Sequence, residues 1–154
     1  MLLADYQKAI KDYDSAIKQA PSVQSGNYRA YHLRGKAYVK IGNHNQAIKD
    51  FDKAIELPKW YYSLPDLRLI NVPKTDVVYR DCGLAYYNLR KYFEGFRDLD
   101  KAIELNPEAE TYLIRAACHE ELGHYPQAIS DYKDAARLGA IGAQDYLRSK
   151  GIQW

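Results

Sequence analysis

The sequence predicts an all-α protein, a solenoid in which antiparallel helix pairs stack one upon the next. Three observations predict this fold class. A seven-residue segment recurs four times along the 154 residues, a second pattern precedes it three times at a fixed distance, and small and aromatic residues recur at intervals of three and four. The composition agrees, because 15 Tyr against 3 Phe and 2 Trp indicates that the same aromatic positions are used repeatedly.

The recurring segment predicts the second helix of each pair. It occupies residues 11–17, 49–55, 97–103 and 130–136, which read KDYDSAI, KDFDKAI, RDLDKAI and SDYKDAA. A small residue stands four positions before each central aromatic residue or leucine, on the same helix face: Ala9, Ala47, Gly95 and Ala128. The carboxylates of the segment repeat with the unit, and we expect them on solvated helix faces.

The second pattern predicts the first helix of each pair. It reads Tyr31-x-x-Arg34-Gly35-x-x-Tyr38, Tyr79-x-x-Cys82-Gly83-x-x-Tyr86 and Tyr112-x-x-Arg115-Ala116-x-x-His119. Its small residue stands 12 positions before the small residue of the following segment in all three units. A Gly or Ala at this point lets two helices approach closely. Glycine-containing turns at 42–43 and 123–124 separate the helices, and Pro126 suits a first helical turn, so each unit is an antiparallel pair.

These patterns resemble the tetratricopeptide repeat, a helix–turn–helix unit of 34 residues with the pattern W-x2-L-G-x2-Y, A-x3-F and Pro. Tyr takes the place of the leading Trp throughout, and Arg or Cys stands where Leu is usual. The resemblance implies a right-handed superhelix and a single domain over residues 1–154. Its parts are expected at 4–21 (a half-repeat with only the second helix), 28–57, 76–107 and 109–138 (repeats), 58–75 (an insertion) and 141–151 (a capping helix).

Two departures from the period leave alternatives open. The half-repeat lacks a partner helix, so either the chain is a fragment of a longer array or something else covers that edge. The insertion contains three prolines and many apolar residues, which is typical neither of one helix nor of a solvated linker. Its aromatic side chains either pack on the adjacent helices or contact a ligand. The candidate contact residues are Trp60, Tyr61 and Tyr62.

Composition and motifs argue against several classes of function. A net charge of +2 is too small for a nucleic-acid-binding surface, no apolar stretch is long enough to span a membrane, and the N-terminus lacks the features of a signal peptide. Two cysteines in a chain of this length predict a reducing compartment, the cytoplasm. His119 is predicted to pack as the tyrosines of the other units do, and Cys82 and Cys118 to be buried and inert. With no catalytic, metal-binding or cofactor-binding motif, we predict that the protein is not an enzyme.

The resemblance also implies a function, because the first helices of this family line a concave groove that binds peptides. The chain is therefore expected to be a protein–protein interaction scaffold that binds an extended or helical peptide. The acidic end of the peptide would lie over Arg29 and Lys36, and its apolar part over Leu84 and Tyr87. The predicted groove residues are Arg29, His32, Lys36, Lys40, Arg80, Leu84, Tyr87, Asn88 and Glu120.

Family members that bind the acidic C-terminus of cytosolic chaperones use a clamp of Lys, Asn, Asn, Lys and Arg. At the corresponding places this chain has His32, Lys36, Asp81, Glu110 and Ile114. Only Lys36 is cationic, so binding of chaperone tails is disfavoured. Two other functions stay open at this point: self-assembly into a homo-oligomer through the unpaired N-terminal edge, and a role as an accessory module of a larger protein.

Overall fold

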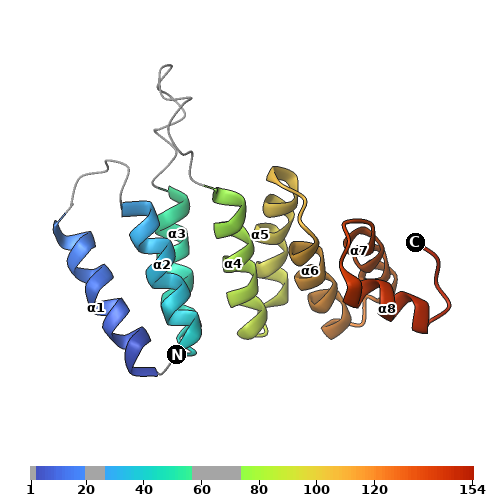
Figure 1. Cartoon of the computed structure of the whole chain (residues 1–154), viewed down its shortest axis with the longest axis horizontal. Helices are drawn as coiled ribbons and strands as arrows, with labels where there is room; N and C mark the ends of the chain where they lie inside the picture. The colour runs from blue at the N-terminus through green and yellow to red at the C-terminus, as the bar shows by residue number, and fades with distance from the viewer. Residues whose placement is uncertain (1–2, 20–26, 57–73) are drawn as a thin grey trace, which may run out of the picture.

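A computed structural model describes residues 3–19, 27–56 and 74–154, and these residues form eight helices that follow one another in a row (Figure 1). The helices are α1 (Leu3–Gln19), α2 (Asn27–Lys40), α3 (His44–Glu56), α4 (Thr75–Asn88), α5 (Tyr92–Leu105), α6 (Ala109–Glu121), α7 (Tyr125–Arg137) and α8 (Ile141–Ser149). Trp60, Tyr61 and Tyr62, the candidate contact residues of the insertion, lie outside the described residues.

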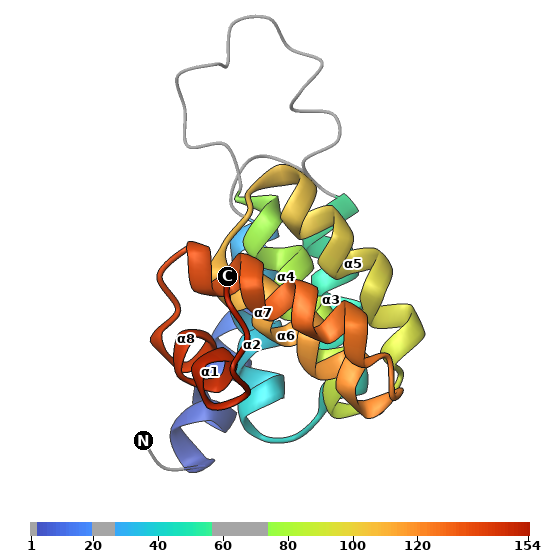
Figure 2. The ribbon, with the colours of Figure 1, turned by 90° about the vertical axis from the view of Figure 1, so that its right-hand side faces the viewer.

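Consecutive helices pack as pairs, and the pairs stack. Figure 2 looks along the row and shows α3 and α5 on one side of α2, α4 and α6, so these five helices form two layers. Each second helix also contacts the first helix of the next pair, and α4 contacts both α2 and α6. The predicted all-α solenoid of antiparallel helix pairs is confirmed.

Small residues at the helix crossings set the distance between paired helices. A Cβ atom added to Gly35 would lie 2.5 Å from the ring of Phe51, and one added to Gly83 would lie 2.6 Å from Cγ of Leu99. Phe51 and Leu99 are fully buried. The recurring segment and the second pattern therefore meet in space, because the glycine of the second pattern lies against the large side chain of the recurring segment.

The turns within the pairs share one backbone conformation. Gly42 and Gly123 end α2 and α6 with φ of +78° and +72°, a region that glycine adopts without a steric penalty. Arg90 takes the equivalent place between α4 and α5 with φ of +59°, and among the described residues it is the one non-glycine with positive φ.

The buried aspartates correct one expectation from the sequence. The carboxylates of the recurring segment were expected on solvated faces, but Asp50, Asp98 and Asp131 are only 2–3% exposed. Two of them accept paired hydrogen bonds from an arginine of the preceding helix: Arg34 to Asp50 at 2.6 and 2.8 Å, and Arg115 to Asp131 at 2.6 and 3.0 Å. The Arg that stands where the family has Leu thus neutralises a buried carboxylate.

Candidate peptide-binding surface

The residues predicted to bind a peptide lie on the three first helices, α2, α4 and α6. We call this set the first-helix surface: Arg29, His32, Lys36, Lys40, Arg80, Leu84, Tyr87, Asn88 and Glu120. On α2, Arg29, Lys36 and Lys40 are seven and four residues apart, which places them on one face of the helix. All three are exposed, and none makes an ion pair within the described part of the chain. This end of the surface is cationic.

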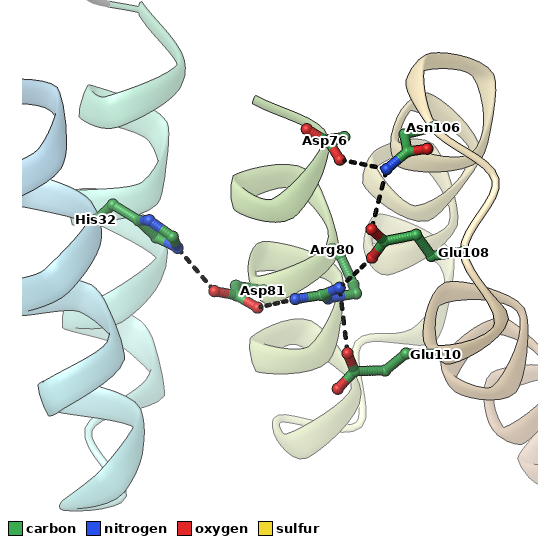
Figure 3. Close-up of polar contacts among 7 residues, drawn as sticks. All are labelled: His32, Asp76, Arg80, Asp81, Asn106, Glu108 and Glu110. Atoms are coloured by element: carbon green, nitrogen blue, oxygen red, sulfur yellow. Dashed lines mark hydrogen bonds and ion pairs between the residues drawn. The ribbon is translucent and has the colours of Figure 1, made fainter. Parts of the chain in front are cut away.

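The middle of the surface is a chain of polar contacts that joins α2 to α4 and α6 (Figure 3). Nε2 of His32 lies 2.7 Å from Oδ2 of Asp81, and the other Asp81 oxygen lies 3.6 Å from Nη2 of Arg80. Nη1 of Arg80 in turn lies 2.6 Å from Glu108 and 3.1 Å from Glu110. Arg80, predicted to contact a ligand, is therefore engaged by carboxylates of the chain itself.

An asparagine extends this network to the start of α4. The side-chain amide of Asn106, in the loop between α5 and α6, donates to Asp76 and to Glu108, at 3.0 Å in each case. Sequence reasoning did not find Asp76, Asn106 or Glu108. The signal that could have found Asn106 and Glu108 is the segment 106–108, Asn-Pro-Glu, where a Pro follows the end of one helix and polar residues precede the next.

Aromatic and apolar groups occupy the C-terminal part of α4. Leu84 and Tyr87 are half-buried and Asn88 is exposed. The Tyr87 ring lies 5.8 Å from the ring of Tyr92, whose hydroxyl donates to Glu121 at 3.1 Å. A partly exposed leucine next to a supported tyrosine is a suitable contact for an apolar peptide side chain.

Glu120 links α6 to the last two helices. It accepts hydrogen bonds from the hydroxyl of Tyr132 at 2.8 Å and from that of Tyr146 at 3.2 Å. Burial and the Glu120 carboxylate raise the pKa of Tyr132 above its ordinary value, so the phenol stays protonated and keeps donating. The structure thus gives Glu120 a role in holding α7 and α8 to α6.

The two thiols are buried, as the pattern predicts, and neither forms a disulfide. Burial raises the pKa of the Cys118 thiol to about 12, and burial together with Asp98 raises that of Cys82 further, so both stay protonated at neutral pH. Among residues 3–19, 27–56 and 74–154, no group of three metal-ligating side chains comes together, and no helix has the length and apolar character needed to cross a membrane.

Stacked helix pairs, each joined by a short turn, define a helical-repeat protein. Two sequence profiles, both described as tetratricopeptide repeat, match residues 28–57 and 81–145. The chain belongs to the tetratricopeptide repeat family.

Comparisons with individual proteins agree with this family. The chain is 26% identical to Hsp70-Hsp90 organizing protein 3 of Arabidopsis thaliana and 24% identical to Hsp70-Hsp90 organizing protein of Triticum aestivum, over 99% of its length. It spans about a third of each relative, 31% and 30%. The crystal structure of MamA aligns with 97% of this chain and 81% of its own, with a TM-score of 0.74 and 23% identity. At that identity the likeness shows the fold.

Proposed function

We propose that the chain is a non-enzymatic adaptor that binds a peptide segment of a partner protein across the first-helix surface. The observation that carries the proposal is the contrast in charge pairing along that surface. Arg29, Lys36 and Lys40 are exposed cations without an ion pair among the described residues, whereas Arg80 is engaged by Glu108 and Glu110. These three exposed cations of α2 are therefore free to attract an anion.

The contrast also gives the bound peptide a direction. Acidic residues of the peptide would lie over α2, and its apolar residues over Leu84 and Tyr87 of α4. Glu110 is exposed near the start of α6 and would repel a carboxylate placed there. A cytoplasmic location is part of this proposal, since Cys82 and Cys118 are unpaired thiols.

The test is selection of peptides from a random displayed library by the wild-type chain, followed by affinity measurement. We expect acidic residues beside apolar ones in the selected peptides. The variant Arg29→Glu/Lys36→Glu is expected to bind them at least about tenfold more weakly, because each reversal turns an attraction into a repulsion. Lys11→Glu/Lys49→Glu is the matched control, with the same change of net charge on exposed residues of α1 and α3. Equal losses in the two variants, or none in the first, would exclude this surface.

The relatives named as Hsp70–Hsp90 organizing proteins favour a second candidate, binding of chaperone tails. The residues at the clamp positions argue against it, because Asp81 and Glu110 stand where the clamp has neutral or cationic side chains. The acidic C-terminal peptide of a cytosolic chaperone should therefore bind no more tightly than a scrambled peptide of equal charge. Tighter binding of the true sequence would replace the proposed specificity with chaperone binding.

Self-assembly through α1 is the other alternative, and the incomplete burial of α1 supports it. Ala9 and Ala16 are exposed or half-exposed, whereas their counterparts Ala47 and Ala54 on α3 are fully buried. An incompletely covered face of this kind can receive another helix. Light scattering coupled to chromatography distinguishes the alternatives, because a monomer whose mass is independent of concentration excludes assembly. A role as an accessory module of a longer protein is compatible with either outcome.

A further inference from the structure

The middle repeat lacks an arginine that the first and third repeats contain. In those two repeats a guanidinium contacts three groups: a tyrosine of its own helix, a buried aspartate of the second helix, and an aspartate of the preceding second helix. For Arg34 these are Tyr31 at 5.3 Å to the ring centre, Asp50 at 2.6 Å and Asp14 at 2.5 Å. For Arg115 they are Tyr112 at 5.6 Å, Asp131 at 2.6 Å and Asp100 at 2.6 Å.

The middle repeat retains all three partner groups but has Cys82 in place of the arginine. The equivalent tyrosine is Tyr79, the buried aspartate is Asp98, and the aspartate of the preceding second helix is Asp52. These three residues line one pocket of about 560 Å³, together with Glu56 of α3 and Glu104 of α5. The pocket thus presents the groups that receive a guanidinium in the other repeats.

Asp98 is the member of this set whose hydrogen bonding is incomplete. The residue is 3% exposed, and its Oδ2 is buried without a hydrogen-bond partner. Its Oδ1 lies 3.4 Å from Nε of Arg97, a long single contact from a side chain that is 80% exposed. Cys82 offers only a weak thiol donor. A buried carboxylate oxygen left in this state is destabilising, so a ligand that donates to it would gain binding energy.

Five carboxylates and two cations, Arg97 and Lys101, line the pocket, which is therefore acidic. Asp100 is engaged by Arg115 at 2.6 Å, and Glu104 by Lys101 at 2.9 Å. Asp52 makes no ion pair within the described part of the chain, and partial burial and the nearby Asp98 carboxylate raise the pKa of its carboxyl group. A cation that contacts Asp52 and Asp98 together would relieve the repulsion between them.

We propose that this pocket binds the guanidinium of an arginine side chain of a partner protein. The planar guanidinium can donate to Asp98 through two N–H groups, reach Asp52 with another, and lie over the Tyr79 ring, whereas an ammonium group cannot reproduce the paired bonds. No residue that lines this pocket belongs to the first-helix surface. The pocket is therefore separate from the first-helix surface, and the two proposals can fail independently.

The test uses a blocked tripeptide, acetyl-Gly-Arg-Gly-amide, titrated into the full-length ¹⁵N-labelled chain. We expect saturable shifts of backbone amides around Asp52 and Asp98. The same peptide with citrulline, which keeps the shape and removes the charge, and the peptide with lysine should each bind at least about tenfold more weakly. Free arginine should also bind more weakly, because its α-carboxylate faces an acidic wall. Absence of saturable shifts, or equal binding of any of these three ligands, would overturn the proposal.

Three variants test whether the peptide binds in this pocket. Cys82→Arg supplies the missing guanidinium from the chain itself and should abolish binding. Asp98→Asn keeps the shape of the side chain and should weaken binding at least about tenfold. Asp145→Asn is the matched control, an exposed carboxylate on α8 that should leave binding unchanged. Circular dichroism checks that each variant folds; if Cys82→Arg does not, Asp98→Asn decides, and unchanged binding in that variant would overturn the proposal.

Discussion

Arg90 holds a backbone conformation that costs free energy in an L-residue with a side chain. Its φ of +59° lies where the other two turns have Gly42 and Gly123. The conformation is imposed by the turn, in which the N–H of Lys91 donates to the carbonyl of Tyr86 at 3.0 Å. We predict that Arg90→Gly raises the free energy of unfolding by about 1 kcal/mol, because glycine has no Cβ to clash in this region.

Thermal unfolding checks this prediction, with an expected increase in Tm of about 2–4 °C. The converse variant Gly42→Arg is the control and should lower Tm by a similar amount. A Cβ atom at Gly42 would meet no heavy atom within 4 Å, so backbone strain accounts for the loss there. A decrease in Tm for Arg90→Gly would mean that the Arg90 side chain contributes more than its strain costs.

His119 should make stability depend on pH. Desolvation lowers its pKa below the ordinary 6.5, and its Nδ1 is buried without a hydrogen-bond partner. The ring lies 4.5 Å from that of Phe96. Because the folded state binds this proton less readily than the unfolded state, the chain loses stability as the pH falls below 6.5 and through the lower folded pKa. His119→Tyr, with the residue of the other units, should lose less stability over the same range.

Urea unfolding of both proteins at pH 7.5 and pH 5.5 measures this difference. An NMR titration of the His119 ring gives the folded pKa directly. A pKa at or above the ordinary value, or an equal loss of stability in the two proteins, would contradict the prediction.

At the scale of single residues, the sequence predicted the place of a residue in the repeat better than the neighbours that surround its side chain. The repeat placed Asp50, Asp98 and Asp131 at equivalent positions. Helical spacing within one segment, however, cannot show which residue of another helix buries the aspartate. The cover comes from the preceding helix, where an arginine stands 16 residues earlier in two of the three units. That shared separation was visible in the sequence. In the middle unit Cys82 stands at that position, so Asp98 lacks the arginine partner that Asp50 and Asp131 have.

At the scale of helices, the glycine of the first helix controls how closely a pair packs. We predict that Gly83→Ala destabilises the chain by about 1–3 kcal/mol, because the new methyl group would lie 2.6 Å from the buried Leu99. Gly142→Ala on α8 is the matched control. A Cβ atom there meets nothing within 4 Å, so the substitution should stabilise by about 0.5–1 kcal/mol through helix propensity alone. Urea unfolding checks both predictions. If Gly83→Ala leaves the free energy of unfolding unchanged, α4 and α5 can move apart without destabilising the chain.

Helices were predictable from the sequence because their signals are local: the spacing of small and aromatic residues, and the glycines at turns. The side-chain contacts within the candidate site were less predictable. Arg80 has the position expected of a ligand contact, yet Glu108 and Glu110 engage it from the start of the next unit. Such pairing depends on the stacking of one pair on another, which a repeat pattern does not specify side chain by side chain.

At the scale of the whole molecule, arginines tie neighbouring repeats together, and they do so unevenly. Arg34 bridges α2 to both α1 and α3, and Arg115 bridges α6 to both α5 and α7. The equivalent bridge from α4 to α3 and α5 is missing, because Cys82 cannot join Asp52 to Asp98. In a solenoid, stability is approximately a sum over units and the interfaces between neighbours, so a weaker interface lowers cooperativity at that point.

Cys82→Arg should therefore raise the free energy of unfolding by supplying the third bridge. We expect a gain of about 1–3 kcal/mol, the range for a charge-assisted hydrogen bond to a buried group, and a rise in Tm of about 2–4 °C for each kcal/mol. Cys82→Leu, which introduces the usual residue of the family at this position, fills space without charge and should not give this gain. A double-mutant cycle tests this by urea unfolding. It compares the wild-type chain with Cys82→Arg, Asp98→Asn and the double variant Cys82→Arg/Asp98→Asn.

The cycle separates the ion pair from simple filling of space. If Arg at position 82 acts through Asp98, most of its gain disappears in the Asp98→Asn background, because an amide cannot accept the paired charged bonds. If the gain is the same in both backgrounds, the arginine stabilises through packing alone. Hydrogen exchange adds the location: amides of α3 and α4 should open more slowly in Cys82→Arg, while those of α7 and α8 stay unchanged. Uniform slowing along the chain would show that the three interfaces already unfold as one unit.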